Sequence, residues 1–494
     1  MKYAHVDESV VIFYAMRFLS GDLHPRVFFD YPSLFLYTLA FLWHVYHALG
    51  MLLGAFGPLE EFIQRYLARD AADIYILARA LSAVCGAATV WVVYRTGVLL
   101  YNHRVGLVAA LLLAMNPLHI LHCHYATPDA AAMLLVTVGA HLLLRGALHD
   151  MPRDIIFGCA VIGLGASTKY YPAALLVNAA LFPLCTRDGY RPAHVRTVLL
   201  GWAVAAGSFL LGTPYALLDF PAFRSRFSVI YSHVAQPEAA GLIPRMGSAL
   251  HHLAVGIGPL CILVLVIGAI RSEASRMERY LFSFPLVLFL MISPWKAVSP
   301  HYLLPLFPFL FIGVAAVMDR IARQFRPWIF PAGAALCAAW FVPNLVTTGV
   351  TLSKPDTRLQ ASAWIQENVP PGSNILRFPY TAEFKPGEPY QVTVDWEGAY
   401  GPDSYDRFDY VIVADTVVDR GNRFVLECAF SGRRLSRFHN PTVRIYRNTV
   451  RPPGTGVAAP EPGEPSVSRT TWKRSNTSSV SREQAIGREP MNEP

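Results

Sequence analysis

The chain has 494 residues, of which 53% are hydrophobic and only 15% are charged, and its net charge is +8. Soluble globular proteins carry about 25% charged residues, and the mean hydropathy here is +0.35, which excludes a soluble globular protein. Runs such as ILARALSAVCGAATVWVVYRTGVLL instead predict a polytopic, mainly α membrane protein, since about 20 apolar residues span a bilayer. The positive charge does not indicate a nucleic-acid partner, because the cations gather in short loops between apolar segments.

The chain begins with two adjacent carboxylates, Asp7 and Glu8. Neighbouring carboxylates at a membrane edge can supply a general base and a partner for a hydrogen bond or a metal. Acidic residues are also favoured in the first turn of a helix, here predicted over residues 9–20. Position alone leaves both explanations open.

The sidedness of the chain follows from its loops. Five basic loops, which we place in the cytoplasm, alternate with connectors that hold few cations. The basic loops are marked by Arg95 and Arg104; Arg145 and Arg153; Arg187, Arg191 and Arg196; Arg271, Arg276 and Arg279; and Arg320, Arg323 and Arg326. The extracytoplasmic connectors are then residues 120–129, 167–172, 213–249, 294–301 and everything after 346.

The apolar segment 34–56 decides on which side Asp7 lies. Aromatic and His residues near its middle suit an interfacial or re-entrant helix. We therefore expect it to lie along or dip into the outer leaflet, which places Asp7 on the same face as Asp129. If it crossed the membrane, Asp7 would be cytoplasmic.

The stretch HCHYATPDAAAMLL opens the next helix of interest. Thr127 as cap, Pro128 at the first helical position and Asp129 in the first turn explain the local pattern as helix-start chemistry. Asp129 nevertheless shares its predicted membrane face with Asp7. His119, His122 and His124 are weak candidates for metal ligands, and interfacial His residues explain them better.

Three basic residues in the extracytoplasmic connectors are further candidates for the site. Lys169, between two apolar segments, is either a functional intramembrane cation or a side chain that reaches the interface. Lys296 and His301 would sit at the depth of a lipid phosphate, where cations could stabilise a phosphate leaving group or merely contact headgroups.

We expect four regions along the chain: residues 1–72, an extracytoplasmic acidic loop with juxtamembrane helices; residues 73–346, the multi-span domain; residues 347–449, a small extracytoplasmic α/β domain; and residues 450–494, a disordered tail rich in Pro, Ser and Thr. Within the α/β domain, DTRLQASAWIQENVPPGSNIL predicts a helix followed by a strand. YQVTV, DYVIVAD and TVRIYRN predict further strands, and residues 421–430 are expected to form a second helix.

The seven Cys residues form no CxxC pair, so small buried side chains are expected rather than zinc ligands or disulfides.

The usual devices for soluble nucleotide donors are absent. The chain has no G-x-x-x-x-G-K-[ST] loop, no G-x-S-x-G or HExxH motif, and no D-x-D triplet. A donor embedded in the bilayer would not require them.

Five stretches in order resemble a known superfamily: HVDESVVIFYAMRFLSGDLHPRVFFDYPSLFLY, YATPDAAAMLL, GLGASTKYYP, LLGTPYALLDFPAF and SPHYLLPLFP. Together they resemble the GT-C glycosyltransferases of the protein O-mannosyltransferase and aminoarabinose-transferase group, most closely the prokaryotic phospholipid-carrier-dependent, family 39-like enzymes. The resemblance covers roughly residues 3–450.

The resemblance implies inverting sugar transfer from a polyprenyl-phosphate donor to a hydroxyl of a protein, lipid or glycan acceptor. It implies Asp7 as general base, Glu8 as a residue that positions the acceptor or a metal, and Asp129 as the second acid. Lys169, Lys296 and His301 would face the donor phosphate, although the family often has Arg where His301 stands. A divalent metal is compatible with the family, but no ligand set is evident.

Family members carry a membrane helix before the acidic pair, whereas Met1 stands six residues before Asp7 here. We therefore expect the genomic reading frame to extend upstream and to encode about 20 further apolar residues.

Two other functions fit parts of the sequence. Intramembrane charges and broken helices also suit a transporter or flippase of a lipid-linked or small substrate, although no internal repeat is evident. A membrane-anchored binding protein, with residues 350–449 as its active part, would leave the acidic loop and the outer Lys residues unexplained.

Overall fold

The computed structural model describes residues 6–26, 28–68, 72–186, 191–235, 241–271, 274–295, 298–384, 387–395, 400, 402–418, 423–433 and 440–450. The chain divides into two compact units, a helical unit over residues 6–348 and a second unit from residue 349 onward. The predicted fold class, mainly α with a small C-terminal sheet, is confirmed. The predicted disordered tail lies outside the described residues, apart from Val450.

The helical unit contains seventeen labelled α-helices among the described residues, the last of which runs into the second unit. They are α1 Val6–Leu19, α2 Leu34–Leu52, α3 Leu59–Ala68, α4 Ala72–Leu100, α5 His103–Ala114, α6 Pro117–Cys123, α7 Asp129–His149, α8 Pro152–Ala166, α9 Leu176–Leu181, α10 Pro192–Gly212, α11 Tyr215–Leu218, α12 Phe220–Ala235, α13 Leu242–Ile257, α14 Pro259–Arg271, α15 Arg276–Ile292, α16 Phe307–Gln324 and α17 Ile329–Leu352. Three 3-10 turns join them: η1 Tyr171–Leu175, η2 Phe182–Leu184 and η3 Pro300–Leu306.

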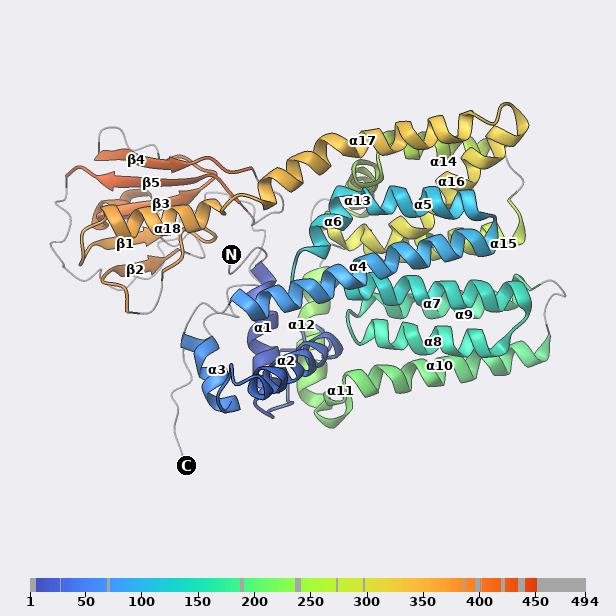
Figure 1. Cartoon of the computed structure of the whole chain (residues 1–494), viewed down its shortest axis with the longest axis horizontal. Helices are drawn as coiled ribbons and strands as arrows, with labels where there is room; N and C mark the ends of the chain where they lie inside the picture. Colours follow the sequence, from blue (N-terminus) through green and yellow to red (C-terminus); the bar gives the residue numbers. More distant parts are fainter. Residues whose placement is uncertain are drawn as a thin grey trace. The chain divides into compact units, whose positions relative to one another are not determined.

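The long helices of this unit have the length and apolarity of membrane spans. Among the described residues six helices could cross a bilayer, or up to eight if two sharply bent helix pairs each count as one span. Figure 1 shows α4, α5, α7, α8 and α10 running side by side, while α1 and α12 run across their direction. The chain is a multi-pass membrane protein.

Small residues let the long helices approach closely. A Cβ added to Gly163 of α8 would lie 2.2 Å from the Ala205 carbonyl oxygen of α10, and one added to Gly97 of α4 would lie 2.5 Å from the Gly106 Cα of α5. Close backbone contact of this kind is the usual packing mode of helices in lipid, where apolar burial supplies little attraction between them.

Helix α2 lies along one end of the helical unit. Its first residue, Leu34, donates its N–H to the Ser167 carbonyl after α8, at 3.0 Å. Later in α2, the Tyr46 hydroxyl donates to Asp73 in the first turn of α4, at 3.1 Å. The start of α4 and the end of α8 lie at this same end, since Arg79 of α4 and Ala126 before α7 both donate to Glu8, and Lys169 after α8 donates to Asp129. Both halves of α2 therefore contact one end of the unit. By length and composition α2 is also one of the six helices that could cross a bilayer, and its non-crossing placement stays a prediction.

The second unit holds a five-stranded sheet of order β2-β1-β3-β5-β4. Strands β1 Asn374–Arg377, β2 Gln391–Val394 and β3 Tyr410–Ala414 are parallel, whereas β5 Val443–Asn448 runs antiparallel between β3 and β4. The four strands predicted from the sequence are confirmed. Helix α18, Thr357–Asn368, is the predicted amphipathic helix and packs its buried Ala361 and Ile365 in the core of the sheet.

The predicted helix over residues 421–430 is wrong, because Phe424–Phe430 forms strand β4. Its sequence, FVLECAF, is rich in residues that favour strands. As the edge partner of β5, it pairs from Phe424 with Asn448 to Phe430 with Val443, with an irregularity between Leu426 and Cys428. Pairing with a distant strand, which sequence periodicity does not report, decided its conformation.

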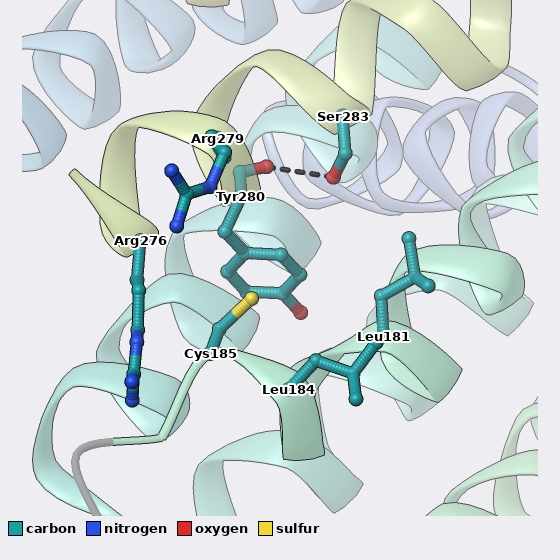
Figure 2. A pocket seen from close by; sticks show the side chains of 7 residues that line it. All are labelled: Leu181, Leu184, Cys185, Arg276, Arg279, Tyr280 and Ser283. Atoms are coloured by element: carbon teal, nitrogen blue, oxygen red, sulfur yellow. Dashed lines mark hydrogen bonds between the residues drawn. The ribbon is translucent and has the colours of Figure 1, made fainter. Parts of the chain in front are cut away.

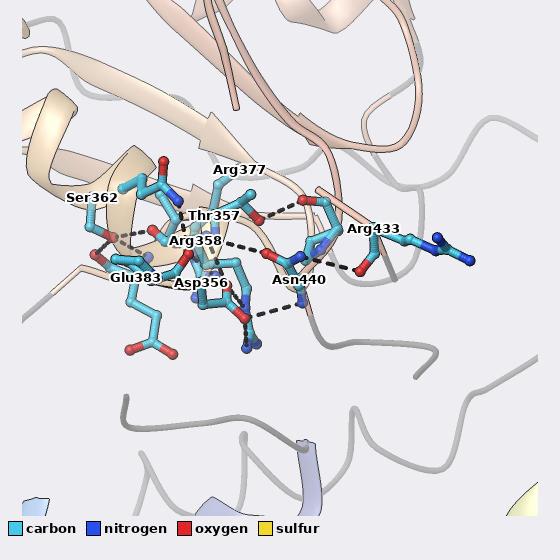
Figure 3. A network of polar contacts seen from close by, with 12 residues as sticks. Asp356, Thr357, Arg358, Ser362, Arg377, Glu383, Arg433 and Asn440 are labelled. Carbon is cyan, nitrogen blue, oxygen red and sulfur yellow. Dashed lines mark hydrogen bonds and ion pairs between the residues drawn. The ribbon is translucent and has the colours of Figure 1, made fainter. Parts of the chain in front are cut away.

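A buried polar network fixes the start of α18 against the turn before β5 (Figure 3). Asp356 caps the helix by accepting the Arg358 N–H at 2.9 Å, and it also pairs with both arms of the Arg358 guanidinium. The Asn440 N–H donates to the same carboxylate at 3.1 Å. Asp356 thereby joins helix and sheet through charge-assisted hydrogen bonds.

Candidate active site

Asp7 and Glu8 open helix α1, and their side chains have different surroundings. The Glu8 side chain is fully buried and accepts two hydrogen bonds from Arg79 of α4, at 2.9 and 2.8 Å. It also accepts the backbone N–H of Ala126 at 2.8 Å. A bidentate pair with a buried carboxylate is among the strongest polar contacts in proteins. Glu8 therefore joins α1, α4 and the segment before α7.

Asp7 is the one of the three predicted site carboxylates that is partly exposed. It accepts a hydrogen bond from the Tyr31 hydroxyl at 2.5 Å. Desolvation of the Tyr31 phenol, together with the charges of Asp7 and Asp129, raises its pKa well above the ordinary value of 10.0. The phenol thus stays protonated and donates to Asp7 at any physiological pH.

Asp129 is the first residue of α7 and is 5% exposed. Its Oδ1 accepts a hydrogen bond from the Lys169 ammonium at 2.5 Å, and its Oδ2 accepts one from the Thr127 hydroxyl at 2.9 Å. Thr127 does not cap α7 as expected, because Pro128 holds the cap position. The carboxylate is held by a buried cation rather than by the helix start.

Lys169 lies in the turn after α8 and is also 5% exposed. Its ammonium sits 5.6 Å from the centre of the Tyr31 ring and 5.5 Å from that of Tyr302. Both distances are within the range of cation–π attraction. Two aromatic faces and one carboxylate therefore compensate for the burial of this charge.

His301 lies in η3 and reaches the same cluster. Its ring stacks on His122 with centroids 5.0 Å apart, and it lies 4.2 Å from the ring of Tyr302. The His122 Nδ1 is in turn 4.0 Å from Asp129 Oδ2. His301 thus lies beside the Asp129–Lys169 pair, although 172 residues separate Asp129 from it in the chain.

Of the six predicted site residues, four meet around Tyr31 and Tyr302. Glu8 is directed to Arg79 instead, and Lys296 lies outside the described residues. Tyr31, Arg79 and Tyr302 were not predicted from the sequence. Arg79 carried a usable signal, because a lone cation inside an apolar span needs a partner. Tyr31 and Tyr302 carried none, since a tyrosine near a membrane interface is commonplace.

The three His residues near residue 120 separate into different environments. His122 joins the cluster, His119 is buried beside Cys123, and His124 is exposed and contacts the Ile120 carbonyl at 2.7 Å. Within the described ranges, no group of three or more His, Cys, Asp or Glu residues is placed to hold a metal ion.

Comparisons with known proteins agree with this architecture. A model of the dolichyl-phosphate-mannose-protein mannosyltransferase family matches residues 58–215, which include Arg79, Asp129 and Lys169. The structure of ArnT from Cupriavidus metallidurans bound to undecaprenyl phosphate is similar, with a TM-score of 0.50 and 15% identity over 90% of this chain and 94% of that chain. The apo form of ArnT gives a TM-score of 0.50 and 14% identity over 90% and 93% of the two chains.

The archaeal oligosaccharyltransferase AglB from Archaeoglobus fulgidus, in complex with an inhibitory peptide and a dolichol-phosphate, is less similar. Its TM-score is 0.42 and its identity 11%, over 83% of this chain and 65% of that chain. No curated protein sequence matches the chain. The family match and the ArnT-like fold confirm the predicted resemblance, in that the chain has the fold of a GT-C membrane glycosyltransferase.

Proposed function

We propose that this protein is an inverting glycosyltransferase that moves a sugar from a polyprenyl-phosphate carrier to an acceptor hydroxyl on the extracytoplasmic face. The observation that carries the proposal is the meeting of Asp7, Asp129, Lys169 and His301 at one end of the helical unit. Buried charges in a membrane protein are costly and are retained chiefly where function requires them. The undecaprenyl phosphate bound to ArnT supports a lipid carrier here.

Asp7 is the proposed general base. It would take the proton of the acceptor hydroxyl while the hydroxyl oxygen attacks the anomeric carbon. The bond between that carbon and the phosphate oxygen breaks in the same step, and polyprenyl phosphate leaves with the bonding electrons. The partial exposure of Asp7 suits a base that must meet an acceptor from outside the bundle.

Lys169 and His301 are the proposed stabilisers of the departing phosphate. An ammonium has three donor hydrogens, and the contact with Asp129 uses one of them. Asp129 would hold the ammonium in place, and the stacked His122 ring together with the tilted Tyr302 ring would orient His301. His301 would act as a neutral donor or as a cation. Preformed positive charge at the leaving group is commonly the largest catalytic contribution.

The contacts of Glu8 support a different role from the one the resemblance implies. A buried carboxylate that accepts three hydrogen bonds from Arg79 and Ala126 is engaged in holding the site together. We therefore assign Glu8 and Arg79 as positioning residues for Asp7, which is the neighbour of Glu8 on α1.

The test is the Asp7→Asn variant of the full chain, purified in detergent. It is incubated with a panel of polyprenyl-phosphate sugars and with acceptor membranes from a strain that lacks this gene, and release of polyprenyl phosphate is measured. We expect the rate to fall by about 10²–10⁴-fold, the usual contribution of a general base. The control is Asp22→Asn, which removes a carboxylate ion-paired with Arg17 and Arg26 and should leave turnover unchanged.

Unchanged turnover in Asp7→Asn would remove Asp7 from the mechanism. If no sugar donor is turned over by the unmodified protein in detergent, while reconstituted vesicles move a lipid-linked substrate across the bilayer, the transporter alternative replaces the enzyme.

A further inference from the structure

A cavity of about 230 Å³ lies between η2 and α15, among residues that the mechanism does not use (Figure 2). Arg276 and Arg279 border it on one side, and Leu181, Leu184, Cys185 and Tyr280 provide the apolar remainder. It opens at the end of the helical unit that carries the basic loops. The position of the cavity follows from Glu278, which neighbours Arg279 on α15. Glu278 contacts Tyr101 after α4 and Arg320 near the end of α16, and both of these residues lie at the end with the basic loops.

The two arginines of this cavity differ from other arginines at the same end. Arg145 pairs with Asp154, Arg191 with Asp150, Arg320 with Glu278 and Arg323 with Asp319. Within the part of the chain that the structure describes, Arg276 and Arg279 form no ion pair. Arg279 makes one hydrogen bond, to the Ala274 carbonyl at 2.9 Å. Some exposed arginines here, such as Arg104 and Arg153, also lack an acid, but they border no described cavity.

The other polar groups of the cavity are already occupied. The Tyr280 hydroxyl donates to the Asn178 carbonyl at 2.9 Å. The Ser283 hydroxyl donates to the Tyr280 carbonyl at 2.7 Å and accepts from Asn178 Nδ2 at 2.7 Å. Among the described residues that line the cavity there is no carboxylate, so the hydrogen-bonding capacity that these residues leave unused is that of two guanidinium groups. Guanidinium groups match the geometry of phosphate oxygens.

We infer that this cavity binds the phosphate of an anionic phospholipid from the leaflet on the basic side of the membrane. Basic pockets between membrane helices on that side are suited to lipid headgroups. The apolar lining continues outward at Leu184 of η2, which is 66% exposed while its neighbours Phe182 and Pro183 are buried. An acyl chain could lie along Leu181 and Leu184 while both arginines hold the phosphate. A soluble phosphate would gain nothing from that apolar surface.

The test is native mass spectrometry of the detergent-purified full chain, titrated with phosphatidylglycerol, phosphatidylcholine or glycerol 3-phosphate. We expect phosphatidylglycerol to bind at least tenfold more tightly than either of the others. The double variant Arg276→Gln/Arg279→Gln should weaken phosphatidylglycerol binding by roughly tenfold to thirtyfold, since each cation near an anionic lipid contributes about fivefold. The matched control is Arg104→Gln/Arg153→Gln, which removes two exposed first-turn arginines that border no described cavity.

Equal weakening in both double variants would overturn the site, because only the overall surface charge would then matter. Equal binding of glycerol 3-phosphate and phosphatidylglycerol would overturn the lipid assignment. A third variant, Arg276→Lys/Arg279→Lys, guards against misfolding. It keeps both charges but loses the planar fork, so it should elute as a monodisperse species and bind phosphatidylglycerol with intermediate affinity. Full affinity in the Gln variant contradicts the proposal outright.

Discussion

The two ends of the helical unit hold their charges in opposite ways. At the end of Asp7 and Asp129, the carboxylates and cations are packed among tyrosine and histidine rings, and the Asp129–Lys169 pair has side chains 6% exposed on both partners. At the end with the basic loops, ion pairs reach the surface, as in Arg323–Asp319 within α16, where the arginine is 69% exposed. Charges that water can solvate cost little, whereas buried charges must be compensated by the protein. The difference supports the proposal that the first end carries the chemistry, while the second has the basic loops that are expected to orient the chain in the membrane.

The largest expected effect comes from breaking the buried pair. Lys169→Met should lower the free energy of unfolding by about 3–5 kcal/mol, because it leaves the Asp129 carboxylate buried without its cation. Unfolding by SDS titration of the purified protein measures this loss. The double variant Asp129→Asn/Lys169→Met should lose less than the sum of the two single variants. Lys354→Met, at an exposed position, is the control; if it were equally destabilising, the loss would not arise from the pair.

A somewhat smaller effect is expected at the clamp between α1 and α4. Glu8→Gln should cost about 2–3 kcal/mol of unfolding free energy, since Arg79 is left partly buried without a full charge partner. Thermal unfolding in detergent, compared with exposed Glu60→Gln, checks this. A Glu8→Gln protein of unchanged stability whose apparent affinity for the acceptor is lost would return Glu8 to the acceptor-positioning role.

The hydrogen bond from Tyr31 to Asp7 tests the proposed role of the first end through enzyme activity rather than through stability. Tyr31→Phe should lower kcat about tenfold, because it removes one hydrogen bond to the proposed base. Since the raised pKa keeps the Tyr31 phenol protonated, its titration should add no alkaline limb to the pH–rate profile. Tyr37→Phe, which removes a hydrogen bond from half-buried Tyr37 of α2 to the Leu23 carbonyl, should keep full kcat. Equal losses in both variants would show that loop packing, not Asp7, is affected.

The smallest effect belongs to the basic end. Arg323→Gln should change the free energy of unfolding by less than about 0.5 kcal/mol, because exposed ion pairs separated by one helical turn contribute little. Arg326→Gln, which removes an exposed arginine of the same loop, is its reference. A cost above about 2 kcal/mol for Arg323→Gln, measured as for Lys169→Met, would abolish the distinction between the two ends.

Part of the site followed from local patterns and from the resemblance to GT-C enzymes. Asp7, Asp129, Lys169 and His301, which lie together in the structure, were all candidates from the sequence, because a polar residue beside an apolar segment stands out in any membrane sequence. The role of Glu8 did not follow. Whether a carboxylate faces a substrate or an arginine depends on Arg79, 71 residues away in the chain. Neighbours along a helix point about 100° apart, so the sequence cannot show which of two adjacent acids turns inward.

The sequence by itself determined that the chain is a membrane protein, that its predicted cytoplasmic loops are basic, and that strands follow the last span. These properties depend on composition and on short-range periodicity, which each segment carries alone. Only the tertiary structure decided that residues 424–430 form an edge strand and that Glu8 clamps α1 to α4. The same holds for Tyr31 and Tyr302, which enclose Lys169. Each of these features depends on residues far away in the chain. Burying a charge or an unpaired strand costs free energy, and only contacts with those distant residues compensate for this cost.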